Sequence, residues 1–212
     1  MKITMFGATG RTGSRAAACL LQEGYEITAL VRTPEKLPPS LAEHPHFHVV
    51  QGEVRSENDL AKVFDEHTSL VYSALSTDKS DTLSAAVPLI IHQMKHYNIR
   101  RIVTIGTAGI LRARSNPDIF RFQSGESKRK MTRAAEEHAS VFKSLKDSGL
   151  DWTIFCPTYL PEGDASDNIL WEVDFLPSGG SRISTGSTAL FTCRHLWEKQ
   201  FFGKRVGLAE SD

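Results

Sequence analysis

The chain has 212 residues, and its 25 Lys and Arg residues balance its 25 Asp and Glu residues, so the formal net charge is zero. This length suits one domain of ordinary size and leaves little room for a second core. Proteins that bind nucleic acid through its phosphates normally carry a basic excess, so the neutral charge argues against a general polyanion binder. A hydrophobic content of 40% argues against intrinsic disorder.

Cysteine usage and the N-terminus bear on the cellular compartment. Cys19, Cys156 and Cys193 are far apart and form no Cys-x-x-Cys motif, so neither a zinc site nor a redox dithiol is predicted. We expect free thiols in a reducing compartment. Residues 1–6 are too few for the apolar segment of a signal peptide, and no apolar run approaches the roughly 18 residues of a membrane span. The sequence therefore predicts a cytoplasmic protein without membrane association.

Strand-like runs alternate with amphipathic helical stretches along the chain. The predicted elements, in chain order, are a strand at 3–6, a helix at about 12–23, strands at 25–31 and 47–50, a helix at about 57–66, a strand at 70–74, a helix at about 82–97, a strand at 102–105, a helix at about 130–147, a strand at 152–155, a helix at about 187–201 and a short strand at 205–208. This alternation predicts the α/β class: a single Rossmann-type, doubly wound parallel sheet in three layers, as one domain over 1–212.

Two stretches interrupt the alternation, at about 108–128 and at about 158–182. Both follow predicted strands, so both lie at the carboxyl edge of the sheet, where ligands bind in open α/β folds. We expect these two stretches to be the substrate loops.

Three glycines at a spacing of three residues follow the first predicted strand and lead into the first helix. In such a turn Gly7 permits the tight bend, Gly10 lets the backbone approach a pyrophosphate, and Gly13 allows close packing of the helix. The helix N-terminus adds free N–H donors and the positive end of a dipole. This context favours dinucleotide binding over a merely structural turn.

The second predicted strand ends at Arg32. A fold that prefers NAD would present Asp or Glu there to the ribose hydroxyls. A guanidinium would instead attract a 2′-phosphate, and Arg11 in the glycine turn would add a second positive charge. The alternative is that Arg32 is a solvated turn residue before the helix-start signal Thr33-Pro34-Glu35. The sequence thus predicts NADP(H) in preference to NAD(H).

Several strings of the sequence share a pattern with one known family. They are GATGRTG at 7–13, ALVR at 29–32, VQGEV at 50–54, IVTIGT at 102–107, and SGLDWTI at 148–154, which is followed by Cys156-Pro157. With these strings the chain resembles, over nearly its whole length, the atypical short-chain dehydrogenases of the NmrA-like and flavin reductase/biliverdin-IXβ reductase type. The last string is the most specific to the family.

The resemblance implies a role for each matching position. The pyrophosphate would lie on Thr9, Gly10, Arg11 and Thr12, the 2′-phosphate on Arg32, and the adenine between Glu53 and Val54. The middle of the cofactor would lie along Ala74, Leu75 and Ser76, and the nicotinamide beside Thr107, in a pocket closed by Pro157, Thr158 and Tyr159.

Three positions depart from the family pattern. Glu53 stands where the family usually has Asp, Thr107 replaces Ser, and Tyr159 replaces the His of the biliverdin-reducing member. The last departure bears on the substrate more than on the cofactor.

A catalytic Tyr-x-x-x-Lys pair, in which Lys lowers the pKa of the phenol, is absent from the sequence. The residues four positions after the four tyrosines are Ala29, Ser76, Arg101 and Gly163. This disfavours an alcohol dehydrogenase and leaves hydride transfer to an electron-poor acceptor. The catalytic candidates are Thr107, which with solvent would manage the proton, and Tyr159, which is either a proton donor or an aromatic wall against the substrate.

Other polar groups have less specific explanations. The alternating His44, His46 and His48 are expected in a surface loop rather than in a metal site. His138 lies on the helix that carries the Tyr and Lys in the family, and it is either a site residue or a helix-surface residue. The basic run at 127–130, with Arg112 and Arg114 nearby, would guide an anionic substrate or form a solvated helix start.

The predicted function is an NADPH-dependent oxidoreductase that transfers hydride to a small flavin-, quinone- or tetrapyrrole-like acceptor. The alternative is a non-catalytic NADP(H)-binding redox sensor of NmrA type. A nucleotide-sugar epimerase ranks third, because it too normally needs the tyrosine base. Neither a metal nor a nucleic-acid partner is predicted.

Overall fold

A computed structural model describes residues 1–77, 80–127 and 131–211. The strands are β1 (Lys2–Phe6), β2 (Glu26–Val31), β3 (Phe47–Gln51), β4 (Thr68–Ser73), β5 (Arg101–Ile105), β6 (Asp151–Pro157), β7 (Ile169–Val173) and β8 (Lys204–Glu210). The α-helices are α1 (Arg11–Gln22), α2 (Pro39–Ala42), α3 (Glu57–Leu60), α4 (Thr82–His96), α5 (Arg133–Lys146) and α6 (Thr185–Arg194). The short 3₁₀ helices are η1 (Pro34–Lys36), η2 (Ala108–Ile110), η3 (Arg121–Gln123) and η4 (Lys199–Phe201).

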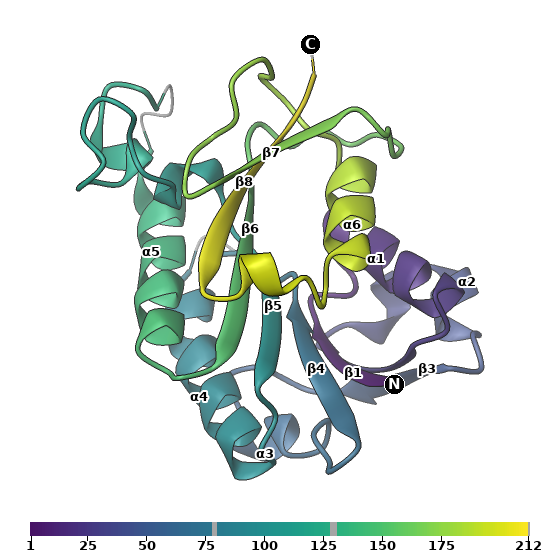
Figure 1. Cartoon of the computed structure of the whole chain (residues 1–212). Coiled ribbons are helices and arrows are strands. Elements are labelled where there is room, and N and C mark those ends of the chain that lie inside the picture. The colour runs from purple at the N-terminus through teal and green to yellow at the C-terminus, as the bar shows by residue number, and fades with distance from the viewer. Residues whose placement is uncertain (78–79, 128–130, 212) are drawn as a thin grey trace.

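All eight strands join one sheet in the order β3-β2-β1-β4-β5-β6-β8-β7 (Figure 1). The pairs from β3 through to β8 are parallel, and β7 runs antiparallel to β8. The strand order reverses between β1 and β4, because β2 and β3 lie on one side of β1 and the later strands lie on the other. Such a switch point opens a crevice at the carboxyl ends of the strands.

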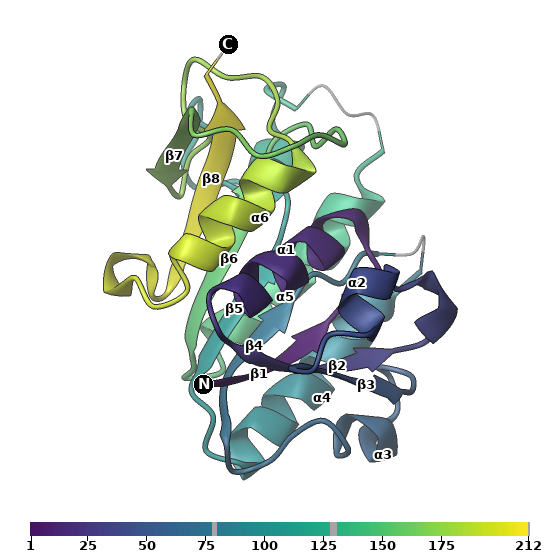
Figure 2. The same cartoon turned by 90° about the vertical axis from the view of Figure 1, so that its right-hand side faces the viewer.

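Helices cover both faces of the sheet (Figures 1 and 2). On one face α1 packs against α6, and their residues share a core cluster that includes Leu20 and Phe191. On the other face α4 packs against α3 and α5, and the second cluster includes Ile90 and Val141. Met5 and Phe6 are neighbours on β1 and point to opposite faces of the sheet, and both are fully buried, one in each cluster, so β1 is covered on both faces. The predicted three-layer, doubly wound α/β fold is confirmed.

The segment predicted as the second substrate loop contains a strand that the sequence analysis missed. Strand β7 crosses the middle of 158–182 and extends the sheet beyond β8. Its residues are only partly buried, and Trp171 at its centre is 43% exposed. An edge strand needs no strongly apolar face, so its local sequence gives a weak strand signal. Strand β7 is recognised by its pairing with β8 and not by its sequence pattern.

Three helix boundaries also differ from the predictions. The helix predicted at 57–66 ends at Leu60, because the chain turns to bury Val63 and Phe64 and the carbonyl of Val63 accepts a hydrogen bond of 2.7 Å from Thr4 Oγ1. The helix predicted at 187–201 is α6 followed by the separate turn η4. Residue 130, where the preceding helix was predicted to begin, lies outside the described residues, and α5 covers Arg133–Lys146. The short helix α2 was not predicted.

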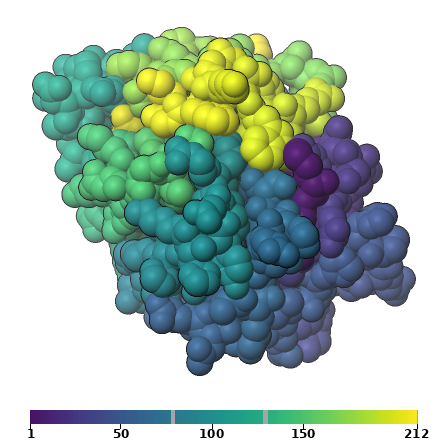
Figure 3. All heavy atoms as spheres, turned by 60° about the horizontal axis from the view of Figure 1, so that its bottom comes forward, coloured from purple at the N-terminus to yellow at the C-terminus, as the bar shows by residue number. Residues whose placement is uncertain are grey.

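The amino ends of the parallel strands lie at the end of the molecule opposite the crevice, and Figure 3 shows this end. There the first residues of the chain lie against the segment that leads into β4, and Lys2 forms an ion pair with Asp65. No helix in the described part of the chain is long and apolar enough to cross a membrane.

Candidate functional site

Three cavities lie at the carboxyl ends of the parallel strands. The basic cavity, of about 280 Å³, lies over β1 and β2 and includes Arg32. The central cavity, of about 580 Å³, lies over the glycine turn, and the distal cavity, of about 340 Å³, lies between the two predicted substrate loops. The basic and central cavities share Gly10, Ala74, Leu75 and Ser76, and the central and distal cavities share Thr107, Ala134, Thr158 and Tyr159. Because neighbouring cavities share walls, they form one groove across the sheet edge.

The glycine turn brings the backbone close to the groove. Gly7 has a φ of +81°, and a Cβ there would lie 2.5 Å from the carbonyl oxygen of Ala74. A Cβ on Gly13 would lie 2.0 Å from the carbonyl oxygen of Gly7, so Gly13 serves the packing of α1 on the turn. A Cβ on Gly10 would have one neighbour, the Gly7 carbonyl oxygen at 3.2 Å, because its other side faces the groove.

The N-terminus of α1 points its free amides toward the central cavity. Gly10 is the N-cap residue and offers no side chain to these amides, and the first turn of α1 holds no acidic residue. Arg11 and Thr12 of this turn line the central cavity, and Thr9 lines the basic one. The positive end of the helix dipole, the free N–H donors of the first turn and the arginine together form a site suited to a pyrophosphate.

Cationic side chains gather at the basic end of the groove. The side chain of Arg32 is 63% exposed, and its Nη1 lies 4.0 Å from Oε2 of Glu53. Lys36 of η1 lines the same cavity. Arg55 lines an adjoining cavity together with Arg32, and its Nη2 lies 2.6 Å from Oδ1 of Asp81. The place of Lys36 and Arg55 beside Arg32 was not predicted from the sequence, because only the folded chain brings the turns after β2 and β3 together.

The other positions assigned to the cofactor also lie along the groove. Glu53 and Val54 line the basic cavity, and the amide of Glu53 donates to Oδ2 of Asp59 over 3.1 Å, which fixes this turn. Ala74, Leu75 and Ser76 follow β4 and line both the basic and the central cavity. The amide of Ala74 donates to the Phe6 carbonyl over 2.9 Å, so the backbone remains bonded to β1 at the point where it enters the groove.

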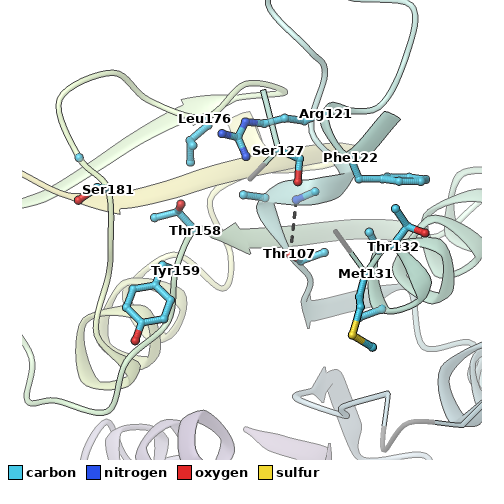
Figure 4. Close-up of a pocket in the computed structure, with 15 residues that line it drawn as sticks. Thr107, Arg121, Phe122, Ser127, Met131, Thr132, Thr158, Tyr159, Leu176 and Ser181 are labelled. Carbon is cyan, nitrogen blue, oxygen red and sulfur yellow. Dashed lines mark hydrogen bonds between the residues drawn. The ribbon is translucent and has the colours of Figure 1, made fainter. Parts of the chain in front are cut away.

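Two loops meet over the distal half of the groove (Figure 4). Thr107 follows β5 and caps η2, and its Oγ1 accepts a hydrogen bond of 3.4 Å from the amide of Gly109. Pro157 ends β6, and the amide of Thr158 donates to the Leu208 carbonyl over 3.1 Å. Tyr159 is 61% exposed, and its carbonyl accepts a bond of 2.9 Å from the amide of Ile183. The threonine hydroxyls and the phenol therefore border one space.

Helix α5 contributes His138 to the wall of the central cavity, together with Ala134 one turn earlier. These two residues have the spacing of a Tyr-x-x-x-Lys pair, but they carry a methyl group and an imidazole. Burial lowers the pKa of His138 to about 4, so the ring is neutral at pH 7. Of the two explanations open for His138, a place in the site is the one that agrees with the structure.

Among the described residues, the distal cavity combines apolar surface with the guanidinium of Arg121. Phe122 and Tyr159 lie on opposite sides of it in Figure 4, and Leu176 and Met131 add further apolar surface. Nη2 of Arg121 donates to the Glu126 carbonyl over 2.9 Å, which holds the guanidinium over the cavity. This composition suits a flat molecule with an anionic or electron-rich edge.

The basic residues proposed to guide an anionic substrate have a different environment. Arg112 Nε lies 3.7 Å from Oδ2 of Asp174, and Arg114 forms an ion pair with Glu172. These two arginines connect the first loop to the β7 region and do not line the distal cavity, so they give no support to that role. Residues 128–130 of the basic run lie outside the described residues.

The alternating histidines lie far from the groove. The rings of His44 and His46 are 5.9 Å apart before β3, and Nε2 of His48 lies 3.3 Å from Oε1 of Glu26. In the described part of the chain, no group of three or more His, Cys, Asp or Glu residues is placed to hold a metal ion.

The sequence between residues 7 and 198 matches the NAD(P)H-binding family. The chain belongs to this family. An uncharacterised chloroplastic protein of Arabidopsis thaliana is 35% identical over 74 residues, which is 34% of this chain. The match spans only 26% of that relative's own length.

Solved structures of similar proteins show the same fold. A candidate NADH-flavin reductase of Streptococcus pneumoniae superposes with a TM-score of 0.81 at 20% identity and covers 100% of both chains. A short-chain dehydrogenase/reductase of Veillonella parvula, solved in complex with NADP, superposes with a TM-score of 0.75 at 18% identity and covers 99% of this chain and 94% of its own. These superpositions show that the present chain has the same Rossmann-type fold as both proteins.

Proposed function

We propose that this protein is an NADPH-dependent reductase that transfers hydride to a flavin- or quinone-like acceptor. The observation that carries the proposal is the continuous groove, which runs from Arg32 across the α1 N-terminus to the distal cavity, where aromatic and aliphatic side chains lie among hydroxyl groups. A groove that binds a dinucleotide needs a polar, cationic half for the phosphates and a second half that leaves the nicotinamide ring open to the substrate. The groove offers these two environments in that order.

The cations at the basic end of the groove support the proposal of NADPH over NADH. Arg32 and Lys36 line the basic cavity, and Arg55 adjoins it, so three cations surround the place expected for a 2′-phosphate. Glu53 and Asp81 pair with two of them but leave a basic excess. The candidate NADH-flavin reductase of S. pneumoniae and the NADP complex from V. parvula have the same fold, which supports a nicotinamide cofactor but does not distinguish NADPH from NADH.

Hydride donation is the chemistry that a reduced nicotinamide supplies when it is bound. The chain's own residues would position the reactants and exclude water: Thr107 and Thr158 form the floor where the central and distal cavities meet, and Tyr159 and Phe122 flank the acceptor. Correct placement of two bound reactants is enough to accelerate such a transfer greatly. Arg121 would neutralise negative charge that develops on the acceptor.

Reduction of a quinone or flavin also needs a proton. Thr107 and Tyr159 offer hydroxyl donors beside the acceptor space, and Tyr159 is open to solvent from which it can be replenished. Neutral His138 can accept or donate a hydrogen bond but places no positive charge beside a phenol. The site is thus built for an acceptor that needs little acid catalysis.

The direct test is to mix the purified protein with NADPH and either FMN or dichlorophenolindophenol and to follow absorbance at 340 nm. Oxidation of NADPH above the protein-free rate supports the reductase. Tight binding of NADPH without turnover across a broad panel of flavins, quinones and tetrapyrroles would contradict it and favour the NADP(H)-binding sensor.

Tyr159→Phe separates the two roles of the phenol. We expect turnover within about twofold of the wild type, because an aromatic wall retains its stacking surface in this variant. Tyr159→Ala, the control, removes the wall and should raise KM. A large fall in kcat for the Phe variant at unchanged KM would instead identify Tyr159 as the proton donor.

A further inference from the structure

Helices α1 and α6 pack side by side on one face of the sheet (Figure 2), and each contributes a cysteine to their interface. Cys193 of α6 is buried and Cys19 of α1 is partly buried. Sγ of Cys193 lies 3.5 Å from the carbonyl oxygen of Ala16, one turn before Cys19 on the same helix. Cys193 belongs to the core cluster between these helices, and Cys19 packs against that cluster. Residues far apart in the sequence therefore form a thiol pair.

The two thiols differ in acidity. The neighbouring Cys193 thiol lowers the pKa of Cys19 to about 7, against the opposing effect of partial burial, and the charge of Arg194 also favours the thiolate. The neighbouring Cys19, together with burial, raises the pKa of Cys193. At neutral pH Cys19 is thus the nucleophile of the pair, and Cys193 keeps its proton.

The two thiols differ in their access to solvent. Cys19 is only partly buried, so a hydroperoxide can reach it from the surface of α1. Cys193, and not Cys19, lines a cavity of about 390 Å³ beside the two helices, together with Glu23, Tyr25, Arg194, Leu196, Trp197 and Glu198. Cys156 lies apart from this pair, fully buried in β6, where burial raises its pKa to about 12.

We propose that Cys19 and Cys193 are a redox-sensitive pair, which a hydroperoxide oxidises to an intramolecular disulfide between α1 and α6. The Cys19 thiolate attacks the terminal oxygen of the hydroperoxide and breaks the O–O bond, which gives a sulfenic acid on Cys19 and an alkoxide, and the alkoxide takes a proton from solvent to become the alcohol. The sulfur of Cys193 then attacks the Cys19 sulfur. The S–S bond forms, and the departing hydroxide takes the Cys193 proton as water. Two thiols are oxidised, and one hydroperoxide is reduced to an alcohol and water.

The disulfide would join two helices that both border the groove. The N-terminus of α1 lines the central cavity through Arg11 and Thr12. The first residues of α6 hold the opposite rim, because the amide of Thr185 donates to Pro161 over 3.1 Å and Pro161 lines the same cavity. The thiol chemistry itself does not rest on the proposed reductase activity.

The test treats the reduced full-length protein with hydrogen peroxide, denatures it and alkylates the free thiols before mass spectrometry. All three cysteines should be alkylated before treatment, and Cys156 alone afterwards. A peptide pair linked through Cys19 and Cys193 should appear and should vanish with dithiothreitol. A sulfinic acid on Cys19 with an alkylated Cys193, or a disulfide found only between chains on a non-reducing gel, would overturn the proposal.

Variants assign the order of the steps. Cys193→Ser should leave the sulfenic acid on Cys19, where dimedone traps it, whereas Cys19→Ser should lose peroxide reactivity at least tenfold. Cys156→Ser is the matched control and should form the disulfide as the wild type does. Circular dichroism confirms that each variant is folded, and loss of the linked peptide in Cys156→Ser would contradict the assignment.

Discussion

At the scale of single residues, the basic cavity depends on Arg32 more than on any other side chain. It follows β2 directly, its side chain is 63% exposed, and its Nη1 lies 4.0 Å from Oε2 of Glu53. An exposed ion pair of this kind contributes little stability, so its rearrangement around an anion would cost little. Lys36 and Arg55 strengthen the positive field around it.

Arg32→Asp should reverse the cofactor preference. Loss of charged hydrogen bonds to a 2′-phosphate lowers NADPH affinity by about ten- to a hundredfold, while the new carboxylate can accept bonds from the ribose hydroxyls of NADH. Fluorescence titration of both cofactors measures the ratio. Arg100→Asp is the control, because Arg100 is also an exposed arginine with a carboxylate partner, Asp151, but lies at the opposite end of the sheet. Unchanged NADPH affinity in Arg32→Asp would disprove the role.

His138 should make the protein less stable in mild acid. Its pKa is lowered from 6.5 to about 4 in the fold, so between these values the unfolded chain binds a proton that the folded chain does not. Stability then falls as pH falls from about 6.5 to about 4, by at most about 3 kcal/mol and by less where the ring meets solvent.

Urea unfolding at pH 7 and pH 4.5 measures this loss. His138→Gln should lose less stability than the wild type between the two pH values, because its side chain does not titrate. His92→Gln, at an exposed position on α4, is the control and should follow the wild type. An identical pH dependence in His138→Gln and the wild type would show that the imidazole titrates normally.

At the scale of elements, the contact between α1 and the end of β1 shapes the phosphate cradle. Gly7 and Gly13 permit backbone approaches that any side chain would block. The same contact directs the N-terminus of α1 at the groove, so packing and ligand geometry depend on the same two glycines.

Gly13→Ala should destabilise the fold and weaken NADPH binding. Its Cβ would lie 2.0 Å from the Gly7 carbonyl oxygen, which is backbone and cannot move aside without shifting the turn. Such overpacking costs about 1–3 kcal/mol or more. Chemical denaturation measures the loss, and Gly125→Ala is the control, because a Cβ there has no neighbour within 4 Å. Equal stability of the two variants would contradict the close approach.

At the scale of the whole molecule, segments from most of the chain build the groove. Turns that follow β1, β2, β3, β4, β5 and β6 all contribute wall residues. The unfolded chain therefore cannot reproduce the site, and a ligand that binds the groove must stabilise the whole domain.

NADPH should raise the melting temperature. At a hundredfold excess over its Kd, a ligand specific for the folded state adds about 2.7 kcal/mol, which corresponds to about 5–10 °C for a domain of this size. Differential scanning fluorimetry with NADPH and NADH at equal concentration should show the larger shift for NADPH. A larger shift with NADH would contradict the predicted preference.

Local patterns in the sequence determined the alternation of strands and helices, the glycine turn at Gly7 to Gly13 and the basic residue after the second strand. Periodicity and turn chemistry act between residues close in the chain, so they can be read without the fold. Only the tertiary structure decided that β7 is a strand, that His138 lines a cavity, that Lys36 and Arg55 join Arg32, and that Cys19 meets Cys193. These features arise from contacts between distant segments, which burial and pairing create and local sequence does not encode.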